Sequence, residues 1–508
     1  MKRRLLAILL CLTVICSLVA CAPASTGDSG TSGKASTLAN KAPGEPITVA
    51  MSDVSSLDPM KNWQISSYYC YWTIYERLIR LNQETGEYEP ELATDWEVAE
   101  DGMSITFHLR QGVKWHDGSD FTSKDVKWTI ERGIETGTGN YPSVDHVETP
   151  DDYTAVVYMQ SPESVFMDKQ WTGDCCVMPY GCNDSIAQHP IGTGPYKFKE
   201  WLSGDHITIE RNEDYWGEPA KCSSITFKII PEDAAKLIAL QSGDVDIAPL
   251  QSTDVKHVEA DDNLLLLGVT SIRMDYLGYN CKSEYFDDAR VRQAAAYAIN
   301  RQTIVDGILE GYGAVVNSPI PEGKPDYYDG IEGYEYNPEK AKELLAAAGY
   351  PDGFECELCI RENPLVAQLI QADLAAVGIK VKLNQMESAT FLEYVGEGKG
   401  DIFLAYRSGG PADIYVSWFD SEGVGAVGNL THYSNPAMDK LYKQSHLTVD
   451  IDARYEVYKD IQELAMEDLP ALPLYAATVF VGENKNVSGF TPDPEACHDF
   501  RYVTWGNG

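Results

Sequence analysis

Few residues in this chain combine the types and spacings that chemistry requires. One group of thiol and imidazole side chains could hold a metal ion: Cys175, Cys176, Cys182 and His189. Cys356-x-x-Cys359 has the spacing of a dithiol redox pair. Neither group has the paired CxxC spacing of a zinc site, and Cys356 and Cys359 lie in a strand-like stretch where residues three apart face opposite sides. We therefore expect structural cysteines, either buried or disulfide-bonded.

Motifs that would indicate catalysis are missing or misplaced. Gly423–Gly428 matches GxGxxG, but Asn429-Leu430-Thr431-His432 follows it instead of a helix, which argues against a dinucleotide site. The sequence contains no GxSxG elbow, HExxH motif, Walker loop or EF-hand pattern. With 77 carboxylates in the chain, no acid/base pair can be nominated on spacing alone. We expect a protein that is not an enzyme and carries no cofactor.

Cys21 stands in a context that predicts lipidation. Three positive charges within Met1–Arg4 precede an apolar stretch, Leu5–Val19, that is shorter than a membrane-spanning helix. The run ends Leu18-Val19-Ala20-Cys21, which resembles a bacterial lipobox. The sequence thus predicts a signal peptide over 1–20 and a lipid on Cys21. The mature protein would be held at the extracytoplasmic face of the cell membrane through this lipid alone.

The segment after Cys21 predicts a flexible tether and an acidic folded body. Residues 22–46 are almost wholly Ala, Ser, Thr, Gly, Pro and Lys, which cannot bury enough apolar surface to become ordered. Without residues 1–20, 37 bases face 77 acids, a net charge of −40. Such a surface repels nucleic acid and anionic headgroups and favours a solvated monomer. Nine cysteines follow Cys21, so at least one has no disulfide partner within the chain.

The hydrophobic pattern predicts a mixed α/β fold. Short strand-like runs such as Ser104–Leu109 and Thr154–Met159 dominate residues 78–190, after a helix expected over Ser66–Arg80. Beyond residue 190, helices and strands alternate, as in α/β domains. The clearest unit, 337–383, has a helix that begins after Asn337 and ends at Gly349, a second helix to Val377, and a strand of period two over Ile379–Leu383.

Several ordered segments of the chain are similar to a known family. They include Glu89–Trp96, Ile105–Gly118, Thr122–Val126, Pro190–Phe198, Asp288–Ile299 and Asp468–Leu474. Over about 80–480 the chain resembles the extracellular solute-binding proteins of family 5, the peptide/nickel-type receptors of ABC importers. The resemblance implies two lobes joined by a hinge, with an extra subdomain inserted in lobe I.

The resemblance and the change of pattern near residue 190 together predict domain boundaries. Lobe I would comprise 47–77, 190–270 and 475–508, with the inserted subdomain over 78–189 and lobe II over 271–474. Arg110 with Asp117-Gly118, and Gly192–Pro195, are expected to set turns and core packing, not to contact the ligand. The ligand should lie between the lobes, near strand ends and the loops that follow them.

This rule leads to the loop Arg407–Trp418 and to Arg361. In peptide-binding relatives the place resembles aromatic-x-x-Asp, whose Asp receives the peptide ammonium; here the residues are Tyr406-Arg407-Ser408-Gly409. Either Asp413 takes that role or the ligand has no free N-terminus there. Arg361 could hold a carboxylate or form a salt bridge. Tyr406, Tyr415 and Trp418 could stack against the ligand, and so, more weakly, could Tyr69. For Tyr415, Trp418 and Tyr69, core packing is the alternative.

We therefore predict a lipid-anchored receptor that closes around a small solute and delivers it to an ABC permease and its ATPase subunits. Short peptides are the leading ligand class, followed by oligosaccharides and then metal chelates. A secreted hydrolase, or a chaperone or adhesin with the same fold, is a less favoured alternative.

Overall fold

The computed structural model describes residues 41–506, except 83–86, 138–140, 142, 163, 165, 171, 173–174, 325, 409–411, 426–427 and 449. The predicted signal peptide, Cys21 and most of the predicted tether lie outside these residues. In the part that is described, no helix combines the length and apolar character needed to span a membrane.

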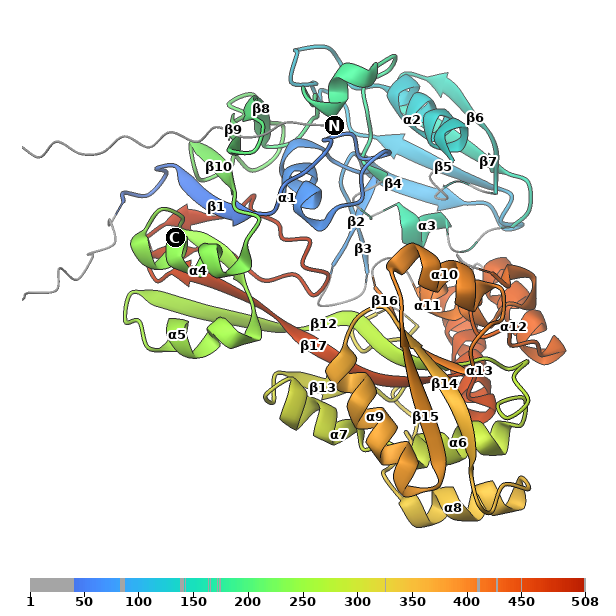
Figure 1. Ribbon diagram of the computed structural model, residues 1–508. Helices are drawn as coiled ribbons and strands as arrows, with labels where there is room; N and C mark the ends of the chain where they lie inside the picture. Colours follow the sequence, from blue (N-terminus) through green and yellow to red (C-terminus); the bar gives the residue numbers. More distant parts are fainter. Residues whose placement is uncertain are drawn as a thin grey trace, which may run out of the picture. The chain divides into compact units, whose positions relative to one another are not determined.

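An eleven-stranded mixed sheet dominates the fold, with the order β15-β14-β16-β12-β17-β11-β1-β10-β9-β8 and β13 paired to β17 (Figure 1). Its strands are β1 (Ile47–Met51), β8 (Tyr196–Leu202), β9 (His206–Arg211), β10 (Ser224–Ile229), β11 (Ile247–Leu250), β12 (Leu264–Tyr279), β13 (Gly313–Val315), β14 (Phe354–Ile360), β15 (Ile379–Gln385), β16 (Ile402–Arg407) and β17 (Ala471–Asn484).

Two long strands, β12 and β17, connect the two halves of this sheet. The first half of β12 pairs with the end of β17, which continues through β11 to β1. The second half of β12 pairs with the start of β17 and with β16, which continues to β14 and β15. Figure 1 shows the two strands running side by side over this length. Each half therefore depends on the same pair of strands for its connection to the other.

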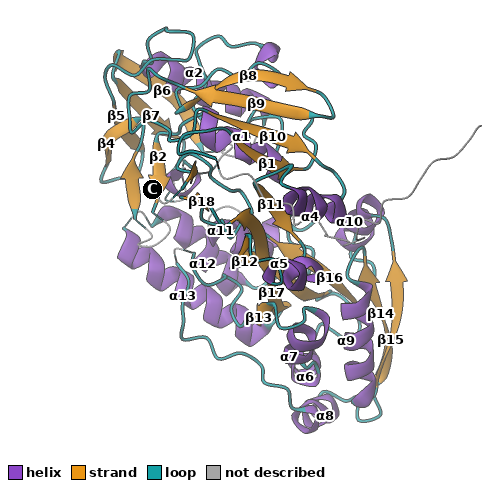
Figure 2. Cartoon of the chain, turned by 90° about the vertical axis from the view of Figure 1, so that its left-hand side faces the viewer, coloured by secondary structure: helices purple, strands orange, loops and turns teal. Residues whose placement is uncertain are grey.

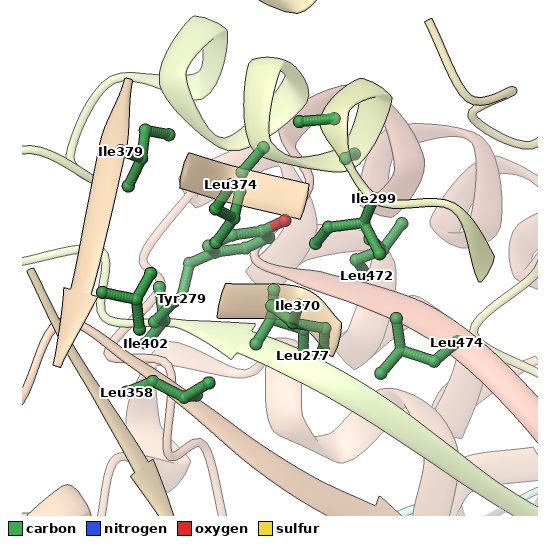
Figure 3. Close-up of a cluster of buried hydrophobic side chains, with 14 of the residues drawn as sticks. Leu277, Tyr279, Ile299, Leu358, Ile370, Leu374, Ile379, Ile402, Leu472 and Leu474 are labelled. Atoms are coloured by element: carbon green, nitrogen blue, oxygen red, sulfur yellow. The ribbon is translucent and has the colours of Figure 1, made fainter. Parts of the chain in front are cut away.

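Separate hydrophobic cores lie on the two sides of this connection. One is formed by β12, β14, β15 and β16 with α6 (Ala289–Ala298), α8 (Pro338–Ala347) and α9 (Pro364–Ala376). In Figure 3, Ile370 of α9 lies next to Leu277 of β12, and Leu374 of α9 lies near Tyr279 of the same strand. A second core packs β1, β9 and β10 against α1 (Ile65–Ile74). Two rigid cores joined by two strands are suited to hinge motion.

The remaining helices cover the sheet or the adjoining loops (Figure 2). They are α4 (Asp233–Ser242), α5 (Val255–Glu259), α7 (Arg301–Thr303), α10 (Ser388–Gly396), α11 (Ala412–Val416), α12 (Pro436–Leu447) and α13 (Ile451–Asp468). Two small antiparallel pairs complete the fold: β2 (Ile79–Leu81) with β3 (Tyr88–Pro90), and β18 (Val487–Ser488) with β19 (Thr504–Trp505).

A four-stranded antiparallel sheet forms a further core of its own. Its order is β4-β5-β7-β6, from β4 (Ala93–Val98), β5 (Ser104–Leu109), β6 (Val144–Asp151) and β7 (Thr154–Met159), with α2 (Ser123–Thr136) and α3 (Phe166–Lys169) beside it. The buried residues of this core all fall between Leu78 and Val177. The inserted subdomain predicted over 78–189 contains all of them, and its boundaries stay a prediction.

A buried triad of charged residues links this sheet to α13. Arg454 Nη1 lies 3.0 Å from Asp168 Oδ2, and Arg454 Nη2 lies 3.2 Å from Asp326 Oδ2. All three side chains are at most 5% exposed. Ser164 adds hydrogen bonds to the carbonyls of Ser445 and His446 at the end of α12. The small sheet is thus connected to the half of the molecule built around β14 and β16.

Most expected elements are confirmed, and one is wrong. Asn337 caps α8 by accepting from the Lys340 amide, and α9 and β15 follow as predicted. The helix expected over Ser66–Arg80 ends at Ile74, and Ile79–Leu81 is strand β2. The chain leaves the helix here because β2 pairs with β3 and the Ile74 carbonyl accepts a hydrogen bond from the Gly194 amide.

The segments that carry the family resemblance mainly build turns and packing, as predicted. His116 bonds through Nε2 to the Gly194 carbonyl, and its Nδ1 accepts from the Gly192 amide. Arg110 donates to the Glu91 carbonyl and stacks over the Trp216 ring. Burial lowers the pKa of His116 to about 4, so the ring stays neutral near pH 7.

The close approach of Gly192 to α1 gives a testable prediction. A Cβ on Gly192 would lie 1.8 Å from the Ile74 carbonyl oxygen, which is backbone and cannot rotate away. We expect Gly192→Ala to lower the free energy of unfolding by about 2–3 kcal/mol or more, measured by denaturant unfolding. Gly307→Ala is the control, because its Cβ would meet nothing within 4 Å. Equal stability of the two variants would contradict this account.

Candidate functional site

The carboxyl ends of β14 and β16 bring a group of charged side chains together in the middle of the large sheet. β14 and β16 pair in parallel, and β12 runs antiparallel beside β16. The site that we describe consists of Arg273, Asp275, Arg361, Glu362, Asn363, Tyr406 and Tyr475. They come from four different strands or the residues directly after them.

An irregularity in β12 positions Arg273. Thr270 pairs with Thr478 and Met274 with Ala476, so three residues of β12 lie opposite one residue of β17. The amide of Arg273 donates to Ser271 Oγ, which in turn donates to the Pro494 carbonyl. These bonds replace the missing ladder contacts, as expected for backbone groups in an interrupted strand pair. The bulge directs Arg273 towards β16.

Arg273 is held by a carboxylate and an aromatic ring. Its Nε and Nη2 donate to the two oxygens of Asp275 at 3.2 and 3.3 Å, and its guanidinium carbon lies 3.7 Å from the centre of the Tyr406 ring. Burial alone would lower the pKa of Arg273, but the Asp275 carboxylate outweighs it and raises that pKa. Arg273 is therefore a permanent positive charge on the hinge strand.

Asn363 ties the loop after β14 to both hinge strands. It adopts the left-handed conformation at φ 58° before Pro364, the first residue of α9. Its Nδ2 donates to Asp275 Oδ1 at 3.0 Å and to the Tyr475 hydroxyl at 3.3 Å. Burial raises the pKa of Asp275 despite the neighbouring Arg273, and burial also raises the pKa of Tyr475. The turn that carries Arg361 and Glu362 is thus fixed by polar contacts.

Arg361 lies over two aromatic rings with few polar partners. Its guanidinium carbon is 4.8 Å from the centre of the Tyr406 ring and 5.4 Å from that of Phe391. The side chain is only 15% exposed. Its contact with Glu362, 3.6 Å from Nε to Oε1, is longer than a hydrogen bond. Within the described residues, no acceptor forms a hydrogen bond with this guanidinium.

The other predicted site residues are placed in different ways. Arg407 donates from Nη2 to the Gly428 carbonyl and lies over the Trp418 ring. Tyr415 and Trp418 are buried in the core, and the Tyr415 hydroxyl donates to the Ile272 carbonyl. Tyr69 is buried against His498 and Phe500, well inside the other core. In this structure these three rings face protein, as the core-packing alternative predicts.

The positions of Gly409, the Asp413 side chain and Cys21 are not described by the structure. Gly409 and Cys21 lie outside the described residues, and for Asp413 only the backbone, in α11, is described. The roles assigned to them stay predictions.

The nine cysteines that the structure describes are largely shielded from solvent. Seven are buried, and Cys182 and Cys281 are half-buried. Cys356 packs into the core under α9, whereas Cys359 packs into the neighbouring core with Phe391. The two thiols thus face opposite sides of β14, as the strand period predicts. Among the described residues, no group of three His, Cys, Asp or Glu side chains has a geometry that could hold a metal ion.

A cavity lies beside β12 and β17, and the sequence does not predict it. It has a volume of about 570 Å³ and is lined by the β12 bulge, the segment 314–318, the turn 321–324 and residues 493–495. Lys324 and Glu495, from the two sides of the hinge, form an ion pair of 2.7 Å at its edge. No local pattern in the sequence marks these residues, because they meet only after the chain has folded.

Asp493 at this cavity gives a pH-dependent prediction. Burial, reinforced by Glu495, raises the pKa of Asp493 to about 7. A raised carboxyl pKa stabilises the protein at low pH, and this contribution is lost as the pH rises from about 4 through 7. The Asp493→Asn variant keeps the acceptor that binds the Glu495 and Cys497 amides. We expect it to be more stable than the native protein by about 1–3 kcal/mol at pH 8 and equal to it at pH 3, measured by denaturant unfolding.

A stabilisation of the same size at both pH values would contradict the titration of Asp493 as its cause.

Comparisons with known proteins agree with this architecture. Residues 87–425 match the family described as bacterial extracellular solute-binding proteins, family 5 Middle. The chain is 28% identical to the dipeptide-binding protein of Escherichia coli K12 over 476 residues, covering 85% of this chain and 89% of that protein. It is 30% identical to the glutathione-binding protein GsiB of Pectobacterium atrosepticum, covering 80% and 84%.

A solved structure has the same fold at higher coverage. The periplasmic binding protein DppA from Helicobacter pylori, in complex with the peptide STSA, superposes with a TM-score of 0.75 at 27% identity. The match covers 91% of this chain and 98% of that one.

Proposed function

The chain belongs to the bacterial extracellular solute-binding proteins of family 5, and from this premise we propose that its solute is a short peptide bound through its carboxylate. Proteins of this family are substrate-binding components of ABC importers and not enzymes. Arg361 would hold the peptide carboxylate, and the Tyr406 ring would keep the guanidinium in position through the cation–π contact. The partners would be an ABC permease and its ATPase subunits.

The observation that carries this proposal is the unused hydrogen-bonding capacity of Arg361. A guanidinium presents five N–H donors. The Arg361 side chain is only 15% exposed, no described residue accepts a hydrogen bond from it, and its nitrogens are not among the buried atoms without a partner, so they stay open to solvent and to a ligand. A ligand carboxylate matches the planar fork of donors and would restore these bonds.

The aromatic residues favour peptides over oligosaccharides. Stacking on a sugar requires an exposed ring face, and Tyr415 and Trp418 have none in this structure. Tyr406 is half-buried and already carries Arg273 and Arg361 close to its ring. Relatives named for dipeptides and glutathione support a carboxylate-bearing solute. Oligosaccharides and metal chelates remain the alternatives, in that order.

Closure around the ligand would proceed by bending at β12 and β17. Contacts from both halves favour the closed state only if the ligand binds that state more tightly. Arg273 on the hinge strand and Arg361 after β14 would respond to the same ligand group, which connects binding to the position of the hinge.

Calorimetry tests this proposal. We expect di- to hexapeptides with a free carboxylate to bind, and Arg361→Met to weaken that binding by at least about tenfold, because a charged hydrogen bond contributes about 1.5–3 kcal/mol. Arg211→Met is the control, since Arg211 pairs with Glu213 on the opposite half of the sheet. Binding of oligosaccharides without any peptide would contradict the proposal.

The same experiment tests the role proposed for Asp413. If Asp413 receives the peptide ammonium, acetylation of the peptide N-terminus weakens binding to the native protein but not to Asp413→Asn. Equal loss of affinity in both proteins would contradict that role.

We also propose that Cys21 carries the lipid that anchors the receptor beside its permease. The apolar stretch Leu5–Val19 and the residues Leu18-Val19-Ala20 before Cys21 support this assignment. The segment 22–46 would then be a tether that leaves the body free to orient. We expect Cys21→Ser to move the protein from the membrane fraction to the soluble extracytoplasmic fraction. Retention of the variant in membranes would contradict lipidation at Cys21.

A further inference from the structure

The Glu362 carboxylate lies between two arginines without a good hydrogen bond to either. Its Oε1 is 3.4 Å from Arg273 Nη2 and 3.6 Å from Arg361 Nε. Charge-assisted hydrogen bonds between guanidinium and carboxylate are normally 2.7–2.9 Å long. Oε1 is itself buried, and none of the described residues donates a hydrogen bond to it. Glu362 thus balances charge in this place without satisfying the donors around it.

The two arginines are better fixed than the glutamate between them. Arg273 is held by both oxygens of Asp275 and by the Tyr406 ring, and Arg361 by the rings of Tyr406 and Phe391. The Glu362 side chain is 39% exposed, and its Oε1 contacts at 3.4 and 3.6 Å do not form hydrogen bonds. A rotation of Glu362 into water would therefore break no hydrogen bond to Oε1, and the two guanidinium groups would keep the contacts that hold them.

The local charge balance makes such a rotation conditional on the ligand. Arg273 and Arg361 face two carboxylates, Asp275 and Glu362. If Glu362 rotated away and no ligand took its place, two partly buried guanidinium groups would share one carboxylate. A ligand that brings its own carboxylate restores the balance and can satisfy both forks of donors with better geometry.

We propose that Glu362 occupies the place of the ligand carboxylate in the unliganded receptor, and that the ligand displaces it to bridge Arg361 and Arg273. This inference rests on the proposed function, because it concerns the same solute and the same site. Glu362 then acts as a specificity-determining residue. A peptide with an amidated C-terminus cannot replace its charge and is rejected, whereas a free carboxylate competes with it successfully.

Calorimetry with a peptide in two forms, free acid and C-terminal amide, tests the displacement. Glu362→Gln removes the competing charge, so we expect it to bind the free acid about tenfold more tightly than the native protein does. Arg273→Met should weaken binding of the free acid by about the same factor and leave the amide unaffected. The control is Glu355→Gln, since Glu355 lies on the same strand but pairs with exposed Lys382.

The outcomes separate this inference from the proposed function. Peptide binding by the native protein with the same affinity in Glu362→Gln, or a weaker one, overturns the displacement and leaves the peptide receptor intact. No binding of either peptide form to any variant contradicts both. If Arg273→Met does not fold, Arg273→Lys keeps the charge without the fork, and the ratio of free-acid to amide affinity should still fall towards one.

Discussion

The pairing of β12 with β17 is the constraint on which the remaining structure depends. Both strands are long enough to belong to two groups of strands at once, and each group packs its own core. Backbone groups in the middle of the pair still need hydrogen-bond partners, yet the register shifts there by two residues. Ser271, Pro494 and Tyr415 supply those partners. The region that can bend is therefore also the region where side chains from distant segments must meet.

The charged site follows from this constraint. A regular strand would alternate its side chains between the two faces of the sheet, but the bulge brings Arg273 over the Tyr406 ring and within reach of Glu362. Asp275, two residues on, lies on the same face and holds it. In a protein with 77 acids and 40 bases, two arginines gather here beside one aromatic ring and are balanced by Asp275 and Glu362. The guanidinium donors, and not a net positive charge, are therefore what the site offers to an anionic group.

The residues that stand out in the sequence, namely the glycines of the shared motifs, the cysteines and the large aromatic residues, mainly have structural positions. The Gly192–Pro195 segment bonds to α1 and to His116, and seven of the described cysteines are buried. Aromatic residues near the expected ligand loop, such as Trp418, are core as well. Polar residues with modest local signals, Glu362 and Asn363 in particular, form the site instead. For Tyr415 and Trp418, core packing was one of the two roles expected from the sequence, and the structure places both rings in a core.

Much of the local structure, and the class of protein, could be predicted from the amino-acid order alone. Capping residues and the 3.6- and 2-residue periods defined α8, α9 and β15 almost to the residue, and the ordered motifs indicated family 5. Arg361 and Tyr406 could also be nominated from the sequence, because each lies at or directly after the end of a recognisable strand. The contacts between distant side chains could not be predicted in this way. They are Arg273 with Glu362, Asn363 with Tyr475, and Lys324 with Glu495. These pairs are separated by about 90 to 170 residues, so their contacts depend on strand register and on the β12 bulge. Neither of these leaves a periodic trace in the sequence.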